Sequence, residues 1–300
     1  DYGLGVSYRI SSNAVGRIRV DADGKSTKQE SVVQRVSFTP HLSFGKKLEL
    51  HSDFQLAAGQ LNYEGVPEEF RSGGLPYGEN SAFSDAMSKQ LQLRKLYLKW
   101  TSPIGAVIVG RMASQWGLGM MANSGDDVQR EWGDTVFGDD RGYGDLVSRV
   151  AFATKPMLFF SQSDFAQKLI FVIGADKVHR DDHIRDGMGD NAYQGLGALK
   201  YMDGANEIGM YMAYRDLEDR NGANLEAWVL DIAGKGERSF GDIRLYTKGE
   251  LAYVTGSTSI AANYAHRDSL DVKQLGYVGQ IGLQYKPWGT AADIETGYAS

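Results

Sequence analysis

Hydrophobic and polar residues alternate with a period of two along most of this chain. Leu48 and Leu50 lie in one phase, together with the apolar residues that follow, whereas Glu49 and His51 lie in the other. A period of two is typical of a β-strand whose two faces meet different surroundings. The segment before it alternates in the same way, and only residues 45–46 separate the two, which predicts a tight hairpin.

The alternation predicts an all-β fold with about thirteen strands, since helical periodicity is nearly absent. The strands are expected near residues 3–20, 31–44, 47–59, 92–102, 105–116, 145–155, 166–177, 192–202, 205–216, 222–233, 240–256, 272–286 and 290–300.

Short and long connections alternate between these strands. Short ones are expected at residues 45–46, 103–104, 203–204 and 287–289, long polar ones at 60–91, 117–144, 178–191 and 256–271, and intermediate ones near 156–165 and 234–239. This asymmetry is typical of a transmembrane antiparallel up-and-down β-barrel with short periplasmic turns and long extracellular loops.

A soluble β-sandwich or propeller would also alternate, but its apolar phase would face a core. Here aromatic residues mark many segment ends, as at Phe44, Trp100, Trp116, Tyr214 and Trp288. Aromatic girdles at the two membrane interfaces are expected of a membrane barrel, and strands of about 10–12 residues suit a tilted span of the hydrocarbon layer. The sequence therefore favours the membrane barrel.

Composition narrows the functional classes. The chain of 300 residues has no cysteine, which excludes disulfide staples and thiolate metal or redox sites. A formal net charge of −6 with scattered Lys and Arg argues against a nucleic-acid partner, and no run of about 18 apolar residues predicts a transmembrane helix. No charged-then-apolar leader precedes Asp1, so the chain is either mature or cut from a longer protein. No cofactor is expected.

Several motifs are similar to those of a known family. Gly110-Arg111, the stretch Gln115–Gly119, Ala122-Asn123, the run Tyr143–Val150, and the segments Gly249–Ala252 and Val272–Gly276 resemble an uncharacterised family of outer-membrane β-barrel proteins from myxobacteria and their relatives. More distantly, the chain resembles porin-like barrels grouped with alginate exporters. The resemblance implies a multi-pass protein of the bacterial outer membrane with a channel-like form, but it supplies no substrate and no catalytic residues.

Residues 1–300 are expected to form one outer-membrane barrel domain whose C-terminal strands are missing. The chain ends at residues 297–300, within what looks like a strand followed by a loop. Bacterial single-chain barrels have an even number of strands, and an open edge is not viable in lipid. We therefore expect further strands after Ser300, and about 14–18 in the complete barrel.

If the apolar phase faces lipid, the other phase faces a lumen, where charged residues set ion preference or brace the wall by pairing with one another. The pore-lining residues predicted are Arg35, Lys95, Lys99, Arg111, Gln115, Arg149, Arg215, Arg244, Lys248 and Glu250. In the strand that holds Arg111, Ala113 should also point into the lumen, while Ile108, Gly110 and Met112 face lipid. Trp116 is expected at the membrane interface, with residues 117–119 leaving the membrane.

Carboxylates in the loop 117–144 are weak candidates for a calcium site, with Asp126, Asp127, Asp139 and Asp140 as ligands. A solvated acidic loop is the simpler interpretation, and inward folding of this loop or of residues 60–91 to narrow the pore is a third. Residues 19–30 resemble part of a calcium loop but are interpreted as a turn, and His179 and His183 as part of a polar external loop.

Three functions remain open. The first is a porin-like channel for small polar or anionic solutes. The second is the outer-membrane pore of a polysaccharide or lipid export system, which requires a periplasmic partner. The third is a barrel hydrolase with a site at the outer rim, although the chain has no local motif of serine or zinc hydrolysis, so an enzyme is not expected. Outer-membrane lipid and lipopolysaccharide are the expected surroundings, and the oligomeric state stays open.

Overall fold

The structure is a computed structural model that describes residues 1–19, 26–60, 92–124, 145–181, 189–260 and 269–300. Within these residues it is almost entirely β. The strands are β1 (Tyr2–Arg19), β2 (Ser26–Phe44), β3 (Leu48–Gln60), β4 (Gln92–Ser102), β5 (Gly105–Ala113), β6 (Leu146–Thr154), β7 (Leu169–Arg180), β8 (Asn191–Asp203), β9 (Asn206–Glu218), β10 (Asn224–Phe240), β11 (Ile243–Thr258), β12 (Leu270–Tyr285) and β13 (Thr290–Ala299). The described helices are the short elements η2 (Pro156–Phe159), α3 (Asp164–Lys168) and η5 (Lys286–Trp288), and none of them is long or apolar enough to span a membrane.

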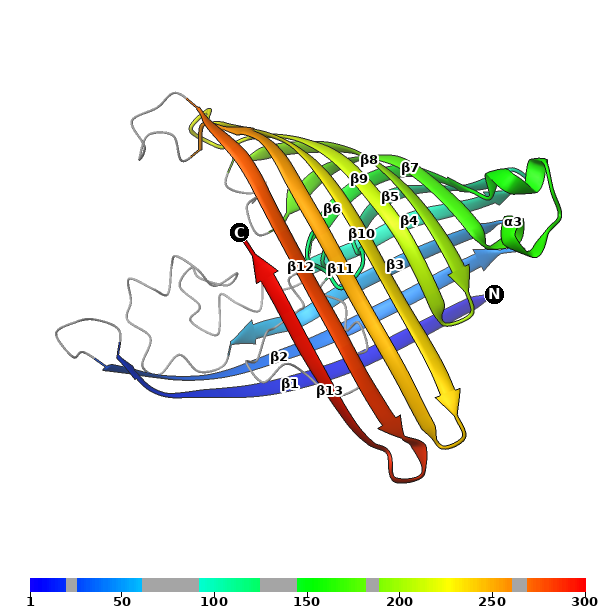
Figure 1. The fold of residues 1–300 in the computed structure, drawn as a ribbon. Coiled ribbons are helices and arrows are strands. Elements are labelled where there is room, and N and C mark those ends of the chain that lie inside the picture. Colours follow the sequence, from blue (N-terminus) through cyan, green and yellow to red (C-terminus); the bar gives the residue numbers. More distant parts are fainter. Residues whose placement is uncertain (20–25, 61–91, 125–144, 182–188, 261–268) are drawn as a thin grey trace. The chain divides into compact units, whose positions relative to one another are not determined.

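The described strand pairings are all antiparallel and join strands that are consecutive in the chain. In one compact unit, Asp1–Leu98, β1, β2 and β3 pair in that order. In a second unit, which begins at Lys99, β5 to β13 pair in chain order and can be followed from cyan to red in Figure 1. This confirms the predicted all-β, antiparallel, up-and-down fold.

Several boundaries differ from the expected ones: β2 begins at Ser26 instead of near residue 31, β5 ends at Ala113 instead of near 116, and β7 covers Leu169–Arg180 instead of 166–177. β10 continues through residues 234–239, because Gly234–Phe240 pair with Ile243–Gly249 although the glycines interrupt the hydrophobic alternation. The connection near residues 156–165 holds η2 and the start of α3. There the side chain of Ser163 caps α3 by accepting a hydrogen bond from the Ala166 amide at 3.3 Å.

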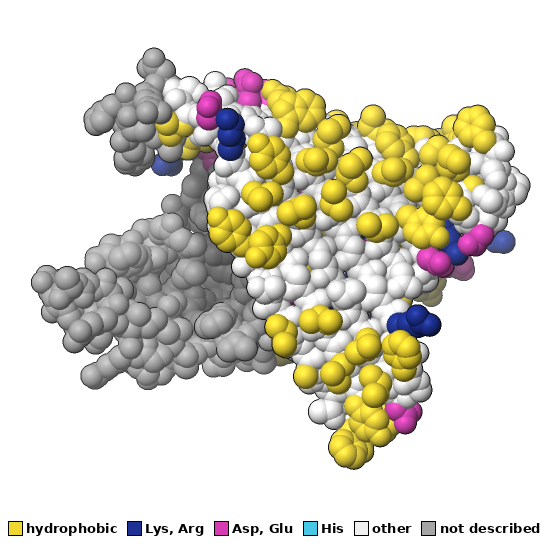
Figure 2. All heavy atoms as spheres, in the orientation of Figure 1, with side chains coloured by type: hydrophobic (Ala, Val, Ile, Leu, Met, Phe, Trp, Pro, Cys, Tyr) yellow, Lys and Arg dark blue, Asp and Glu magenta, His cyan; other side chains and the backbone are white. Residues whose placement is uncertain are grey.

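Strand register gives the second unit two different faces, because directly paired residues project to the same side of a sheet. We call one of them the apolar face. It carries Ile208, Met210 and Met212 of β9, Leu230 and Ile232 of β10, Leu245, Leu251 and Tyr253 of β11, and Tyr277, Ile281 and Leu283 of β12. These side chains are between 42% and 62% exposed, and Figure 2 shows hydrophobic side chains spread over this side with charged ones toward its ends. This much exposed apolar surface is expected of a sheet face that contacts lipid.

The opposite side, the polar face, carries Arg149 of β6, Asp176 of β7, Gln194 and Lys200 of β8, Tyr211 and Arg215 of β9, Asp231 and Lys235 of β10, and Arg244, Lys248 and Glu250 of β11. The usual distribution of a soluble protein is therefore inverted. Asp231 and Glu250 are only 0% and 3% exposed, whereas leucines and isoleucines of the same strands face outward.

The first unit shows the same alternation in its described pairs. Phe38 lies opposite Phe54 and Leu42 opposite Leu50, while the residues between them form polar pairs such as His41 with His51. The turn after β2 includes Gly45, whose φ of 63° lies in the left-handed region that favours glycine. The hairpin predicted at residues 45–46 is therefore present, with the turn extending to residue 47.

Candidate functional site

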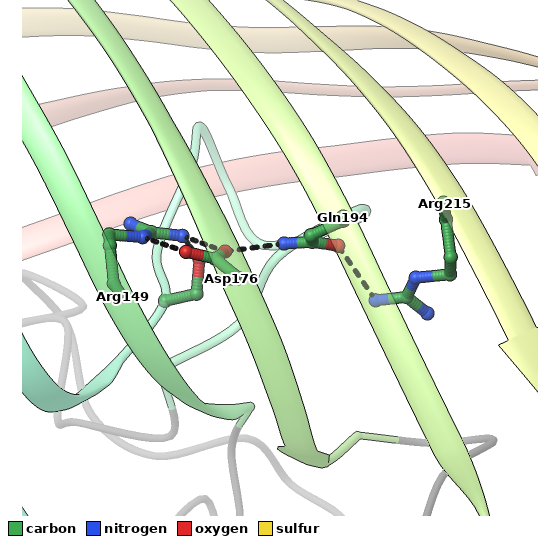
Figure 3. Close-up of polar contacts among 5 residues, drawn as sticks. Arg149, Asp176, Gln194 and Arg215 are labelled. Atoms are coloured by element: carbon green, nitrogen blue, oxygen red, sulfur yellow. Dashed lines mark hydrogen bonds and ion pairs between the residues drawn. The ribbon is translucent and has the colours of Figure 1, made fainter.

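A chain of hydrogen bonds runs across β6, β7, β8 and β9 on the polar face (Figure 3). Nε and Nη2 of Arg149 each lie 2.7 Å from an oxygen of Asp176, a bidentate pair. Gln194 then donates through Nε2 to Asp176 Oδ2 at 2.7 Å and accepts from Arg215 Nη2 at 3.1 Å. Arg215 also pairs with Asp181 at 2.6 Å. Because these strand residues lie directly opposite one another in the register, the network follows from the strand pairing itself.

Residues 114–124, which follow β5, form a compact loop that we call the docked segment. Its ends meet because Trp116 N donates to Ala122 O at 2.9 Å and Ser124 N donates to the side-chain oxygen of Gln115 at 2.9 Å. Arg149 also donates to Ser114 Oγ at 2.9 Å, which joins the start of the segment to the network on β6 and β7. The loop is therefore fixed at its base before it reaches the other strands.

The docked segment crosses to β10 and β11, where two buried carboxyl groups receive it. Trp116 Nε1 donates to Asp231 Oδ1 at 2.9 Å. The backbone amides of Leu118 and Met120 both donate to Glu250, the latter to Oε1 at 3.1 Å. Three N–H groups of one loop thus meet acceptors on two adjacent strands.

Apolar contacts support the same docking. The Trp116 ring stacks on Tyr211 with 5.4 Å between ring centroids, and it packs against the buried cluster that includes Leu196 and Ala213. Gly209 makes room for the indole, because a Cβ at that position would lie 2.7 Å from the Trp116 ring. The lack of a side chain at Gly209 therefore leaves the space on β9 that the Trp116 ring occupies.

A second glycine lies in the docked segment itself. Gly117 has a φ of 50°, and a Cβ there would lie 2.6 Å from Glu250 Oε2 and 2.8 Å from the Cβ of Ala233. A residue with a side chain would be strained in this left-handed backbone conformation, and its Cβ would also collide with side chains of β10 and β11. Close approach to β10 and β11 therefore requires glycine at this position.

Basic side chains lie on the polar face next to the docked segment, toward the end of the sheet that carries the short turns. Lys200 Nζ lies 3.0 Å from Glu207 and 5.9 Å from the centroid of the Trp116 ring. Lys235 is 3.7 Å from the same carboxylate, and Lys248 lies over the Tyr246 ring at 5.4 Å. Basic groups therefore lie beside the docked segment on the side of the short turns.

Apart from Arg111, the predicted pore-lining residues divide into three groups. Arg149, Arg215, Arg244, Lys248 and Glu250 share the polar face of the second unit. Lys95 and Lys99 lie half-buried on β4, and Gln115 lies in the docked segment after β5 has ended. The backbone of Arg35 pairs with Arg9 on β1, but its side chain lies outside the described residues. Glu250 holds the docked segment, a role that the sequence did not indicate.

The expected phase of β5 is wrong. Gly110 pairs with Arg149, whereas Arg111 pairs with Ser148, so Gly110 lies on the polar face and Arg111 on the other. Met112 follows Gly110 onto the polar face and is buried. The reason is that both phases of this strand are largely apolar. The alternation therefore predicts a strand but does not say which phase lies on the polar face. Arg111 is the one charged residue of the strand, and its charge alone favours the opposite orientation.

The expected position of Trp116 is also wrong. Its indole does not lie in an interfacial girdle but stacks on Tyr211 and bonds to Asp231. Residues 117–119, expected to leave the membrane, lie in the docked segment, with Leu118 bonded to Glu250. Inward folding, one of three interpretations of the loop 117–144, is therefore present at the start of that loop.

Several residues of the site were missed by the sequence reasoning. Asp176 and Asp231 each stand alone as a carboxylate within an otherwise apolar run, residues 171–176 and 228–233. A lone acid on an apolar strand is costly unless it has a partner, and this was the available signal. The partners themselves, such as Trp116 for Asp231, could not be found by local spacing because they lie 115 residues apart.

The weak calcium candidates Asp126, Asp127, Asp139 and Asp140 lie outside the described residues. Within the described part of the chain, no group of three or more His, Asp or Glu side chains is arranged to hold a metal ion. His183, with its neighbouring aspartates, also lies outside the described residues, whereas His179 is described and lies 2.7 Å from Ser148 Oγ.

An antiparallel sheet with an outward apolar face, an ionic opposite face and a loop docked on that ionic face defines an outer-membrane β-barrel protein. No protein-family model and no curated protein matches the sequence. Solved structures to which the chain is similar include a loop-deletion form of OmpT, an outer membrane protein of Vibrio cholerae (13% identity, TM-score 0.35, covering 100% of this chain and 93% of that one). They also include Salmonella typhi OmpF in complex with daunomycin (12%, 0.36, 100% and 96%) and an anion-selective porin from Comamonas acidovorans (10%, 0.33, 100% and 98%).

Proposed function

We propose that this protein is a porin-like channel of the bacterial outer membrane that passes small polar or anionic solutes. The observation that carries the proposal is the docked segment on an ionic sheet face whose reverse side is apolar. A wall of this kind separates lipid from water, and a loop held against its wet side narrows the path. The apolar face would contact outer-membrane lipid and lipopolysaccharide. We also propose that the protein belongs to the myxobacterial barrel family.

The docked segment also distinguishes between a solute channel and a polymer exporter. It is bonded to β6 through Ser114, to β10 through Trp116 and to β11 through Leu118. A polysaccharide chain needs a wide and continuous lumen, whereas a fixed loop with buried bonds at several points favours the passage of small solutes. The structure therefore supports the channel better than the export pore.

Planar-bilayer recording of the reconstituted protein tests this function. The wild type should show discrete conductance steps, and Trp116→Ala should raise the step size because it removes the indole and its bond to Asp231. Trp228→Ala is the matched control, since that tryptophan lies on the apolar face and is 49% exposed. Circular dichroism would verify that both variants keep the sheet. A wild type without conductance at any voltage or salt would refute the channel.

One contact favours a second candidate, a hydrolase at the rim. Ser148 Oγ lies 2.7 Å from His179 Nε2, and both are accessible near the ends of β6 and β7 that lead to the long loops. A histidine at hydrogen-bond distance can accept the proton of a serine hydroxyl while the oxygen attacks an ester carbonyl. The C–O bond to the alcohol then breaks and the alcohol leaves with that proton, after which water hydrolyses the acyl-serine and releases the acid. We propose this pair as the place where such an activity would reside.

An active-site-directed fluorophosphonate separates the two candidates. A hydrolase should be labelled in the wild type and not in Ser148→Ala, while Ser102→Ala should label normally because that hydroxyl donates to the Gly105 carbonyl near the short turn after β4. Absence of labelling in the wild type would remove the hydrolase and leave the channel untouched.

A further inference from the structure

Three lysines lie together on the polar face, and two of them share a single carboxylate. Lys200 and Lys235 both lie within 4 Å of Glu207, at 3.0 and 3.7 Å, and Lys248 forms no ion pair with any residue that the structure describes. Lys235 of β10 and Lys248 of β11 are directly opposed in the strand register. The group therefore has three positive charges and one negative charge.

Directly opposed like charges on neighbouring strands destabilise a sheet, so this arrangement needs a reason. None of the other described carboxyl groups forms an ion pair with these three lysines. Asp231 accepts from Trp116 and Glu250 from two amides of the docked segment, while Glu237, further along β10, pairs with Arg244. Gln280 of β12, which lies opposite Lys248, offers no charge, and the carboxylates beyond it on β13, Asp293 and Glu295, form no described ion pair with Lys248. Among the described residues, Glu207 is therefore the carboxylate that pairs with this group, through Lys200 and Lys235.

We propose that Lys200, Lys235 and Lys248 form a binding site for a small multivalent oxyanion of the phosphate or sulfate class. The proposal rests on the channel function, because it names the class of solute that the channel would select. Lysine suits this task as a compact charge with three donors that can approach an oxyanion from different sides. A multivalent anion placed between Lys235 and Lys248 would also remove the repulsion between them.

The three lysines lie where an anion that crosses the proposed channel would pass the docked segment. Lys235 and Lys248 each lie two residues from the contacts of the docked segment, at Ala233 and Glu250, on the same face. Lys200 is itself placed over the Trp116 ring of that segment. An anion that passes the docked segment would therefore meet these amines at once, and Lys235 is accessible to it with 47% of its side chain exposed.

The first measurement is phosphate binding in detergent, independent of any current. Titration of inorganic phosphate into the purified protein at constant ionic strength, followed by ³¹P NMR line width, should show saturable binding. Lys248→Met and Lys235→Met should each weaken it about tenfold, the effect of removing one charge-assisted hydrogen bond. Lys248→Arg should retain most of it. Lys155→Met, at an exposed site before η2, removes the same charge away from the group and should change nothing.

The outcomes separate this inference from the channel function. If the protein conducts but phosphate binding is absent, or is equally strong in both methionine variants, the lysine site is wrong and the channel stands. If phosphate binds as expected but the bilayer shows no conductance, the site stands and the channel fails. Sulfate should compete with phosphate while chloride at the same ionic strength should not, and equal competition by chloride would also overturn the proposal.

Discussion

Replacing Gly117 by alanine should release the docked segment from β10 and β11. The new Cβ would lie 2.8 Å from the Cβ of Ala233, which is fixed to the sheet, and 2.6 Å from Glu250 Oε2. The carboxylate could move aside only by weakening its bonds to Leu118 and Met120. The left-handed φ of 50° adds a second cost, since a side chain disfavours that conformation by about 1–2 kcal/mol.

The collision of the new Cβ and the strain of the left-handed backbone together set how far Gly117→Ala should destabilise the docked state. Overpacking against a fixed wall costs about 1–3 kcal/mol, so with the backbone cost the docked state should lose about 2–5 kcal/mol. That loss shifts the docking equilibrium by between about 30-fold and a few thousandfold. Hydrogen exchange of the Leu118 and Met120 amides measures it directly, because both donate to Glu250 only while the segment is docked.

Gly119→Ala is the matched control. Gly119 also has a left-handed φ, 92°, but a Cβ there would be no closer than 3.4 Å to Asn123, within the segment itself. Its substitution should therefore cost about 1–2 kcal/mol, from backbone strain alone. If both variants accelerate exchange equally, the collision of a Gly117 side chain with Ala233 and Glu250 adds nothing to the backbone strain. That result would refute the reasoning from Gly117.

Three further predictions concern the carboxyl groups of the second unit. Glu250→Gln keeps one acceptor oxygen for two amides, so exchange of one of them should rise by about 10- to 150-fold, which corresponds to about 1.5–3 kcal/mol. Arg149→Met leaves the buried Asp176 without its bidentate partner and should lower the free energy of unfolding in denaturant by about 3–5 kcal/mol. The pKa of Asp219 is lowered because the amides of Ala223 and Asn221 donate to its carboxylate. The turn should therefore be stabilised above the ordinary aspartate pKa and lose this stabilisation as the pH falls through the lowered value, as a carboxyl ¹³C titration would show.

Each of these has a contrasting result. Glu295→Gln makes the same change at an exposed position on β13 and should leave exchange in the docked segment unaltered. The double variant Arg149→Met/Asp176→Leu should regain part of the lost stability, because no unpaired charge remains buried. For Asp219, a titration midpoint at or above the ordinary aspartate value would contradict the role of the turn amides.

The strands and most of their faces could be predicted because alternation is a local property. In β9, the apolar Ile208, Met210 and Met212 alternate with polar residues, and the structure places them all on the apolar face. β5 shows where this reasoning fails. Valines in one phase and Ile108 and Met112 in the other make both sides apolar, so only the pairing of Gly110 with Arg149 decides the direction.

The docked segment could not be predicted to the same extent because its contacts are far apart in sequence. The glycines and the tryptophan of residues 116–119 are visible in the sequence, but a girdle aromatic and a docked aromatic have the same local pattern. The difference depends on Gly209 and Asp231, which provide space and an acceptor on other strands. The lone Asp231 in an apolar run indicates that a partner is needed without saying which one.

The bond between Trp116 and Asp231 joins residues that are 115 positions apart, and this constrains the order of assembly. The segment leaves β5 early in the chain, but its acceptors belong to β10 and β11, which must pair before the acceptors are in place. Contacts of such long range form late, because the entropy of closing the intervening chain is lost before they contribute. The docked segment should therefore be among the last parts to reach its final position, and the nascent sheet would insert with an unobstructed interior.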